Sequence, residues 1–179
     1  MRKFALVCSL ASLACIGSSA FAAEVEVNWH QPEKFTDIKP ANESHKAYRE
    51  RVLKHFDGLF ADLANKLPEG YSWTVTVNDL DLAGDIDPFA GRSGQGIRIV
   101  KELYSPAIKF HHILQDKYGE QIINQDEQLR DLGFMQTIHS PQINKEFYYE
   151  QQMLEQWFER NVLPKVAAAQ SAAAKVSSN

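Results

Sequence analysis

The sequence predicts an α+β fold: a two-layer sandwich in which two long helices cover a mainly antiparallel or mixed sheet of four to five strands. Two observations support this. Apolar and polar residues alternate in several short segments, as in half-buried strands, and apolar residues recur every three or four positions in two longer segments, as in amphipathic helices. The helical segments are separated along the chain, with hairpin-like segments between them. This order favours helices on one face of a sheet.

The predicted strands are short and are bounded by turn residues. The first covers residues 24–29, where Val25, Val27 and Trp29 share one side. The second covers residues 73–77, the third 97–104, the fourth 107–115 and the fifth 120–129. Residues 116–119 form the turn of a hairpin between the last two strands.

Two segments have helical periodicity. The first runs from about residue 44 to residue 67, where Pro68 and Gly70 stop it. The second is expected to open at Ser140 and Pro141, with serine as the N-cap, and to end at Pro164. Residues 23–166 then make a single α+β domain, and the Ala/Ser/Gln-rich residues 167–179 are predicted to be a low-complexity disordered tail.

The second strand contains a change of face. Trp73, Val75 and Val77 alternate as one apolar set, but the apolar residues that follow, Leu80 and Leu82, have the opposite parity. Either a bulge at residues 78–79 restores the pattern, or two aspartates point toward the covered face. We predict the bulge, because burying two unpaired carboxylates costs several kcal/mol each.

The first 22 residues resemble a signal peptide. Arg2 and Lys3 precede an apolar run over residues 4–16, and Ala20 and Ala22 place small residues before a cleavage site at Ala23. The sequence therefore predicts export to a bacterial periplasm. Both cysteines, Cys8 and Cys15, lie in the leader, which excludes a disulfide framework and a cysteine nucleophile from the mature chain.

Charge restricts the partners of the mature chain. Without Arg2 and Lys3 the chain keeps 17 basic and 23 acidic residues, a net charge of −6 with neutral histidines. An acidic protein is repelled by phosphate backbones, so nucleic-acid binding is not expected. Apolar runs are also shorter than the roughly 18–20 residues of a membrane-spanning helix, so the protein is not expected to be integral to a membrane.

Four carboxylates lie within nine residues: Asp79, Asp81, Asp85 and Asp87. Clustered aspartates supply the oxygen ligands that a hard divalent cation prefers, and pairs of carboxylates serve acid–base chemistry. These four residues are the candidate metal ligands. The alternative is a solvated acidic strand end and turn. No other cofactor is predicted.

The histidines do not form a metal motif. His111 and His112 are neighbours on a predicted strand and face opposite ways. His112 shares its side with Phe110 and Leu114, so we interpret it as a partly buried core histidine.

Several segments together resemble the domain-of-unknown-function family numbered 3016, secreted proteobacterial proteins. The resemblance spans nearly the whole mature chain and rests on these segments: Val25-x-Val27-x-Trp29-x-x-Pro32-Glu33-Lys34-Phe35, Leu67-Pro68-x-Gly70, Val77-x-Asp79-x-Asp81-Leu82-Ala83-Gly84, Pro106-x-Ile108, Asp131-Leu132-Gly133-Phe134 and Phe147-Tyr148-Tyr149-Glu150. It implies export and a shared fold, and it implies no catalytic residue.

Two functions are compatible with these features. The first is a non-catalytic periplasmic module that binds a protein or a small ligand of the cell envelope. The second is a cation-dependent or carboxylate-based hydrolase centred on residues 79–87.

Overall fold

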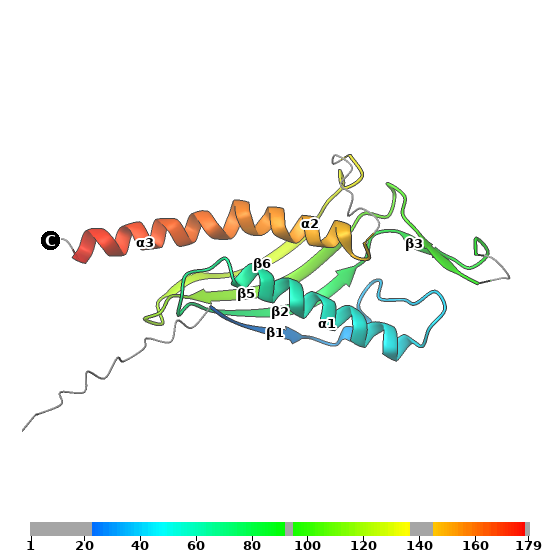
Figure 1. Cartoon of the computed structure of the whole chain (residues 1–179), viewed down its shortest axis with the longest axis horizontal. Helices are drawn as coiled ribbons and strands as arrows, with labels where there is room; N and C mark the ends of the chain where they lie inside the picture. Colours follow the sequence, from blue (N-terminus) through cyan, green and yellow to red (C-terminus); the bar gives the residue numbers. More distant parts are fainter. Residues whose placement is uncertain (1–22, 92–94, 137–144, 178–179) are drawn as a thin grey trace, which may run out of the picture.

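The computed structural model describes residues 23–91, 95–136 and 145–177. Its fold is α+β, as predicted, with two sheets (Figure 1). The larger sheet has four strands in the order β1-β2-β5-β6, and the smaller is a two-stranded ribbon. The strands are β1 (Glu24–Trp29), β2 (Ser72–Asp81), β3 (Asp85–Asp87), β4 (Ile97–Ile99), β5 (Ala107–Gln115) and β6 (Gln121–Arg130).

The four-stranded sheet is mixed. β1 pairs in parallel with β2, while β2 with β5 and β5 with β6 pair antiparallel. The parallel pair needs a crossover, and the first helix, α1 (His45–Ala64), supplies it. The bounds of β1 and β5 match the prediction.

The predicted strand over residues 97–104 is wrong in its length and in its partner. Only Ile97–Ile99 are extended, and they pair with β3 in the ribbon rather than with the main sheet. Tyr104 N donates a hydrogen bond to Lys101 O, which closes a turn where the strand was expected to continue. The alternation of apolar and polar residues in so short a segment did not show whether the strand belongs to the main sheet or to a separate two-stranded ribbon.

Helix α1 covers one face of the main sheet (Figure 1). Ser44 Oγ caps it by accepting a hydrogen bond of 3.1 Å from Ala47 N. Its buried side chains recur at the predicted spacing: Tyr48, Val52, Phe56, Leu59, Phe60, Leu63 and Ala64.

The C-terminal helical segment passes the point where the sequence predicted its end. It consists of α2 (Tyr148–Trp157), a π-helical turn (Phe158–Val162) and α3 (Leu163–Ser177). Leu163 N donates to Phe158 O, an i→i+5 bond, just before Pro164. Proline has no N–H and clashes with the preceding turn of a regular helix, and the widened turn accommodates it.

The predicted disordered tail over residues 167–179 is therefore corrected: the structure continues as helix to Ser177. Alanine, which makes up much of this segment, has the highest helix propensity. The first residues of α3 still pack on the main sheet, because Val166 is buried in the core and Lys165 Nζ donates to Gln125 Oε1 of β6 at 2.8 Å. Figure 1 shows the rest of α3 extending beyond the sheet. The expected start at Ser140 and Pro141 lies outside the described residues.

The predicted bulge in β2 is confirmed. The pairing of β2 with β5 shifts register between Val77 and Asp79. As a result Leu80 and Leu82 join Val77 in the core, and Asp79 stays partly exposed on the other face. The bulge thus determines that the Asp79 side chain lies on the sheet face opposite the core.

Candidate functional site

The four aspartates predicted as metal ligands, residues 79, 81, 85 and 87, lie in two different surroundings. Asp79 accepts hydrogen bonds from Thr36 N (2.8 Å) and Thr36 Oγ1 (2.9 Å), and Lys109 Nζ lies 3.2 Å from its carboxylate. Partial burial raises its pKa, but the bonds from Thr36 and the charge of Lys109 outweigh burial and leave the pKa below its usual value. Asp81 accepts from Arg130 Nη2 at 3.0 Å.

The other two aspartates belong to the ribbon. Asp85 Oδ1 accepts from Ile86 N at 2.8 Å, and Asp87 Oδ1 accepts from Phe89 N at 2.9 Å. Within residues 23–91, 95–136 and 145–177, no group of three or more histidine, aspartate or glutamate side chains is arranged to hold a metal ion. The structure therefore separates these carboxylates: β2 holds one pair in salt bridges, and β3 holds the other in short local turns.

The segment that follows the aspartates leads to a different polar site. Ala83 N donates a hydrogen bond of 2.6 Å to Glu150 Oε1, which links the end of β2 to the first turn of α2. Glu150 is only 2 % exposed. Burial raises the pKa of its carboxyl above the usual value, while the bond from Ala83 and the charge of Arg98 lower it in part.

Arg98 holds the segments around this carboxyl together. From β4, its Nη1 donates to Asp37 Oδ2 at 2.7 Å and to Gly84 O at 2.9 Å, and its Nη2 donates to Lys39 O at 3.3 Å. Asp37 is itself buried, and its Oδ1 has no hydrogen-bond partner among the described residues. One guanidinium thus joins the loop before α1, the end of β2 and the ribbon.

Gly84 is the point where β2 turns into the ribbon, and its conformation requires glycine. Its φ is +83°, and a Cβ at this position would lie 2.6 Å from Ile99 O. Only glycine adopts this conformation without strain and allows the approach of the β4 backbone. The glycine at the end of the acidic segment is therefore required by the structure of this turn.

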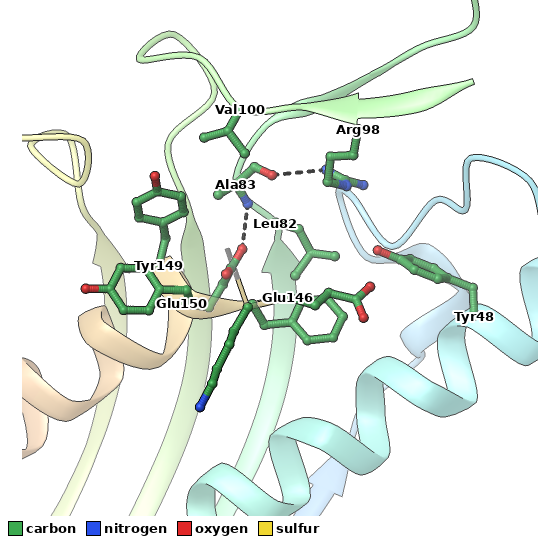
Figure 2. Close-up of a pocket in the computed structure, with 11 residues that line it drawn as sticks. Tyr48, Leu82, Ala83, Arg98, Val100, Glu146, Tyr149 and Glu150 are labelled. Atoms are coloured by element: carbon green, nitrogen blue, oxygen red, sulfur yellow. Dashed lines mark hydrogen bonds between the residues drawn. The ribbon is translucent and has the colours of Figure 1, made fainter. Parts of the chain in front are cut away.

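A pocket of about 260 Å³ opens between these elements (Figure 2). We call it the Glu150 pocket. Its lining comes from α1, the end of β2, β4 with the residue after it, and the start of α2: Tyr48, Leu82, Ala83, Arg98, Val100, Lys145, Glu146, Phe147, Tyr148, Tyr149 and Glu150. In Figure 2 the Tyr48 hydroxyl points toward Arg98, and the Glu150 carboxyl points toward Ala83. The pocket therefore combines aromatic walls with a buried acid.

Two features of the lining set its shape and its electrostatics. Phe147 has φ of +60°, which is unusual for a residue with a side chain, and it immediately precedes the first residue of α2. Such backbone conformations concentrate at binding and catalytic sites. Burial raises the pKa of the Tyr48 hydroxyl, so it stays protonated and can donate a hydrogen bond at neutral pH.

Sequence reasoning missed the residues that build this site: Asp37, Arg98 and Glu150. One signal was available for Glu150. It lies three and four residues before Met153 and Leu154, and therefore on the buried stripe of its helix, where a carboxylate is unusual. For Asp37 and Arg98, which lie 61 residues apart in the chain, no local pattern indicates the salt bridge.

The predicted core histidine is more deeply buried than expected. His112 is 0 % exposed, and its Nδ1 accepts a hydrogen bond of 3.2 Å from Trp73 Nε1. Burial, together with the charges of Lys165 and His111, lowers its pKa to about 4. At neutral pH this ring is an uncharged part of the core and belongs to no candidate site.

Fold and pocket together define a class: an α+β domain with one covered sheet face and a pocket at the junction of sheet, ribbon and helix. The chain belongs to the family described as protein of unknown function (DUF3016), whose model matches residues 23–160. This range contains every residue that lines the Glu150 pocket. No curated protein and no solved structure matched the chain. Among the described helices, none is long and apolar enough to cross a membrane.

Proposed function

We propose that this protein is an exported, non-catalytic module of the cell envelope that binds a small ligand in the Glu150 pocket. The observation that carries the proposal is the convergence of two distant motifs on one pocket. The end of the acidic segment, Ala83-Gly84, meets the Phe147–Glu150 segment through a buried hydrogen bond, and both line the cavity. Pockets with apolar walls and a few fixed polar groups are the usual form of small-molecule sites.

The polar groups of the pocket support binding rather than reaction. Glu150 is held by Ala83 N, and Arg98 is held by Asp37 and three backbone carbonyls. These bonds direct both groups toward the protein itself, where they fix the shape of the cavity. A general acid or base would need its reactive atoms directed at a substrate.

The walls indicate the chemistry of the ligand. The aromatic residues Tyr48, Phe147 and Tyr149 line the pocket together with the aliphatic Leu82 and Val100. We propose a small molecule with an apolar body and one hydrogen-bonding group. The protonated Tyr48 hydroxyl can satisfy that group at the polar side of the pocket.

Export is part of the proposal and rests on residues 1–22. Their charged start, apolar run and small residues before Ala23 are typical of a signal peptide. We expect the envelope fraction of cells that produce the protein to contain a chain beginning at Ala23. N-terminal sequencing of the fractionated protein tests this, and a chain retained in the cytoplasm with residues 1–22 intact would contradict export.

Ligand binding is tested by NMR with three simple probes: phenol, benzoate and butylamine. We expect at least one of them, at millimolar concentration, to shift the amide resonances of Ala83, Gly84 and residues 147–150. Val100→Phe should narrow the pocket and weaken that binding about tenfold. The matched control Ile113→Phe lies on the sheet face opposite the helices and should leave it unchanged. If none of the probes shifts pocket resonances, the small-ligand proposal is wrong.

A further inference from the structure

A second groove lies further along α2, beside strand β6, which forms an edge of the main sheet. We call it the β6 groove; its volume is about 340 Å³. One wall comes from the end of β6 and the residue after it, and the other from α2 and the π-helical turn: Gln128, Leu129, Arg130, Asp131, Met153, Gln156, Trp157, Arg160 and Asn161. It shares no lining residue with the Glu150 pocket.

The strand wall of the groove consists of four consecutive residues, 128–131. Side chains along a strand point alternately to opposite faces, so four neighbours cannot all face one groove through their side chains. The groove is therefore bounded by the edge of the strand. In the order β1-β2-β5-β6, strand β6 has one neighbour, so half of its backbone N–H and C=O groups point away from β5.

An edge of this kind is open to strand pairing. Proteins commonly protect sheet edges by keeping the edge strand short or by placing proline on it. β6 has ten residues and contains no proline, whereas β1 at the other edge has six residues. A long edge strand is the usual acceptor for an extended peptide that adds to a sheet.

The helix wall supplies unused polar groups. Trp157 is 6 % exposed, and its Nε1 has no hydrogen-bond partner among the described residues. An unpaired buried donor costs free energy, but this atom has no exposed surface, so Arg160 is the polar group that a ligand can reach. Arg160 is exposed and has no ion pair within the described part of the chain, whereas Arg130 is held by Asp81 and Ser105.

The π-helical turn gives the helix wall its local shape. Asn161 Nδ2 donates to Trp157 O at 3.0 Å, which satisfies a carbonyl in the widened part of the helix. π-Helical turns occur frequently at functional sites. Here the turn contains Arg160 and Asn161, both of which line the groove.

We propose that the β6 groove binds an extended peptide segment of a partner protein, which pairs with the free edge of β6 and places a carboxylate against Arg160. The backbone of the peptide supplies the acceptors and donors that the strand edge lacks. A terminal or side-chain carboxylate matches the unpaired guanidinium, which favours planar, bidentate contacts.

The probe is an acetylated hexapeptide of alternating threonine and valine with a free C-terminal carboxylate. At millimolar concentration we expect it to shift alternate amide resonances of residues 127–131 and to slow their hydrogen exchange. The same peptide with a C-terminal amide should bind about tenfold more weakly, because it lacks the charge that pairs with Arg160. A peptide with N-methylated backbone amides should not bind.

Arg160→Gln should weaken binding of the carboxylate peptide about tenfold, to the level of the amide peptide. Lys54→Gln, which removes one exposed positive charge from α1, should leave binding unchanged. The proposal is overturned if the carboxylate peptide leaves residues 127–131 unaffected, if the N-methylated peptide binds equally well, or if the shifts fall in the Glu150 pocket instead.

Discussion

Trp73 Nε1 donates a hydrogen bond of 3.2 Å to His112 Nδ1 in the centre of the core. The bond fixes the tautomer of the imidazole, because a nitrogen that accepts cannot carry the proton. The remaining proton is then on Nε2, which lies 3.6 Å from Glu127 Oε1, beyond hydrogen-bonding distance. A neutral histidine thus links the tryptophan of β2 to the interior face of β5.

This relationship predicts a pH dependence of stability. The pKa of His112 is lowered to about 4 in the folded protein, whereas in the unfolded chain it has the ordinary histidine value of 6.5. Between these values the unfolded state binds the proton more readily. The stability that neutral His112 contributes is therefore complete above pH 6.5 and is lost as the pH falls toward 4, by up to about 3 kcal/mol.

The measurement is the free energy of unfolding by urea at several pH values between 4 and 7. His112→Gln keeps an acceptor for Trp73 but removes the titrating group, so its stability should fall less steeply over this range. His45→Gln, an exposed histidine at the start of α1 that does not influence the pKa of His112, is the control and should keep the steep dependence. Parallel curves for wild type and His112→Gln would contradict the assignment.

Glu150 and the Ala83 amide predict an asymmetry between two substitutions. Glu150→Gln keeps an oxygen that accepts the hydrogen bond and removes a charge that burial disfavours. Glu150→Leu leaves the Ala83 N–H without a partner, which costs about 2 kcal/mol. We expect urea unfolding to show a loss for the leucine variant more than twice that for the glutamine variant. Equal losses would mean that the hydrogen bond to Ala83 N does not matter for stability.

Gly84 and Gly58 make a matched pair. Gly84→Ala should destabilise the protein by about 2 kcal/mol or more, because the position has positive φ and its Cβ would clash with Ile99 O. Gly58 lies within α1 with nothing within 4 Å of its Cβ, so Gly58→Ala should stabilise by up to about 1 kcal/mol. Thermal unfolding measures both, and a tolerated Gly84→Ala would show that the turn rearranges at low cost.

The separated aspartates predict the outcome of metal titration. Asp79 is engaged by Lys109 and Asp81 by Arg130, and Asp85 and Asp87 accept bonds from nearby backbone amides. Isothermal titration with calcium, magnesium and zinc should therefore give no saturable heat. Saturable binding that disappears in the Asp85→Asn, Asp87→Asn double variant would restore the cation-dependent alternative.

The sequence predicted those features that depend on parity along a strand. The opposite parity of Val77 and Leu80 was enough to predict the bulge, because misplaced apolar residues and buried carboxylates are both costly. The same argument placed His112 on the covered face beside Phe110. The face on which a strand residue lies follows from its position in the alternating pattern of its own strand, so no distant part of the sequence is needed to predict it.

Features that depend on distant partners were not predictable in this way. Arg98 and Asp37 become partners only after the loop before α1 and the ribbon have been brought together by the fold. Pro164 was expected to end a helix, which is the usual effect of proline. Instead the π-helical turn just before it accommodates the proline ring, and the helix continues. The Glu150 pocket could therefore not be predicted from sequence, although two of its segments, residues 77–84 and 147–150, belong to the motifs that resemble the family.

The helix α3 has a practical consequence. Its 15 residues rise about 1.5 Å each, so it reaches about 22 Å beyond the π-helical turn. A fluorophore attached on its outer turns, for example at Ala173, would stand clear of both the sheet and the ribbon. Such a label could follow tumbling or surface immobilisation of the protein while leaving the rest of the molecule unobstructed.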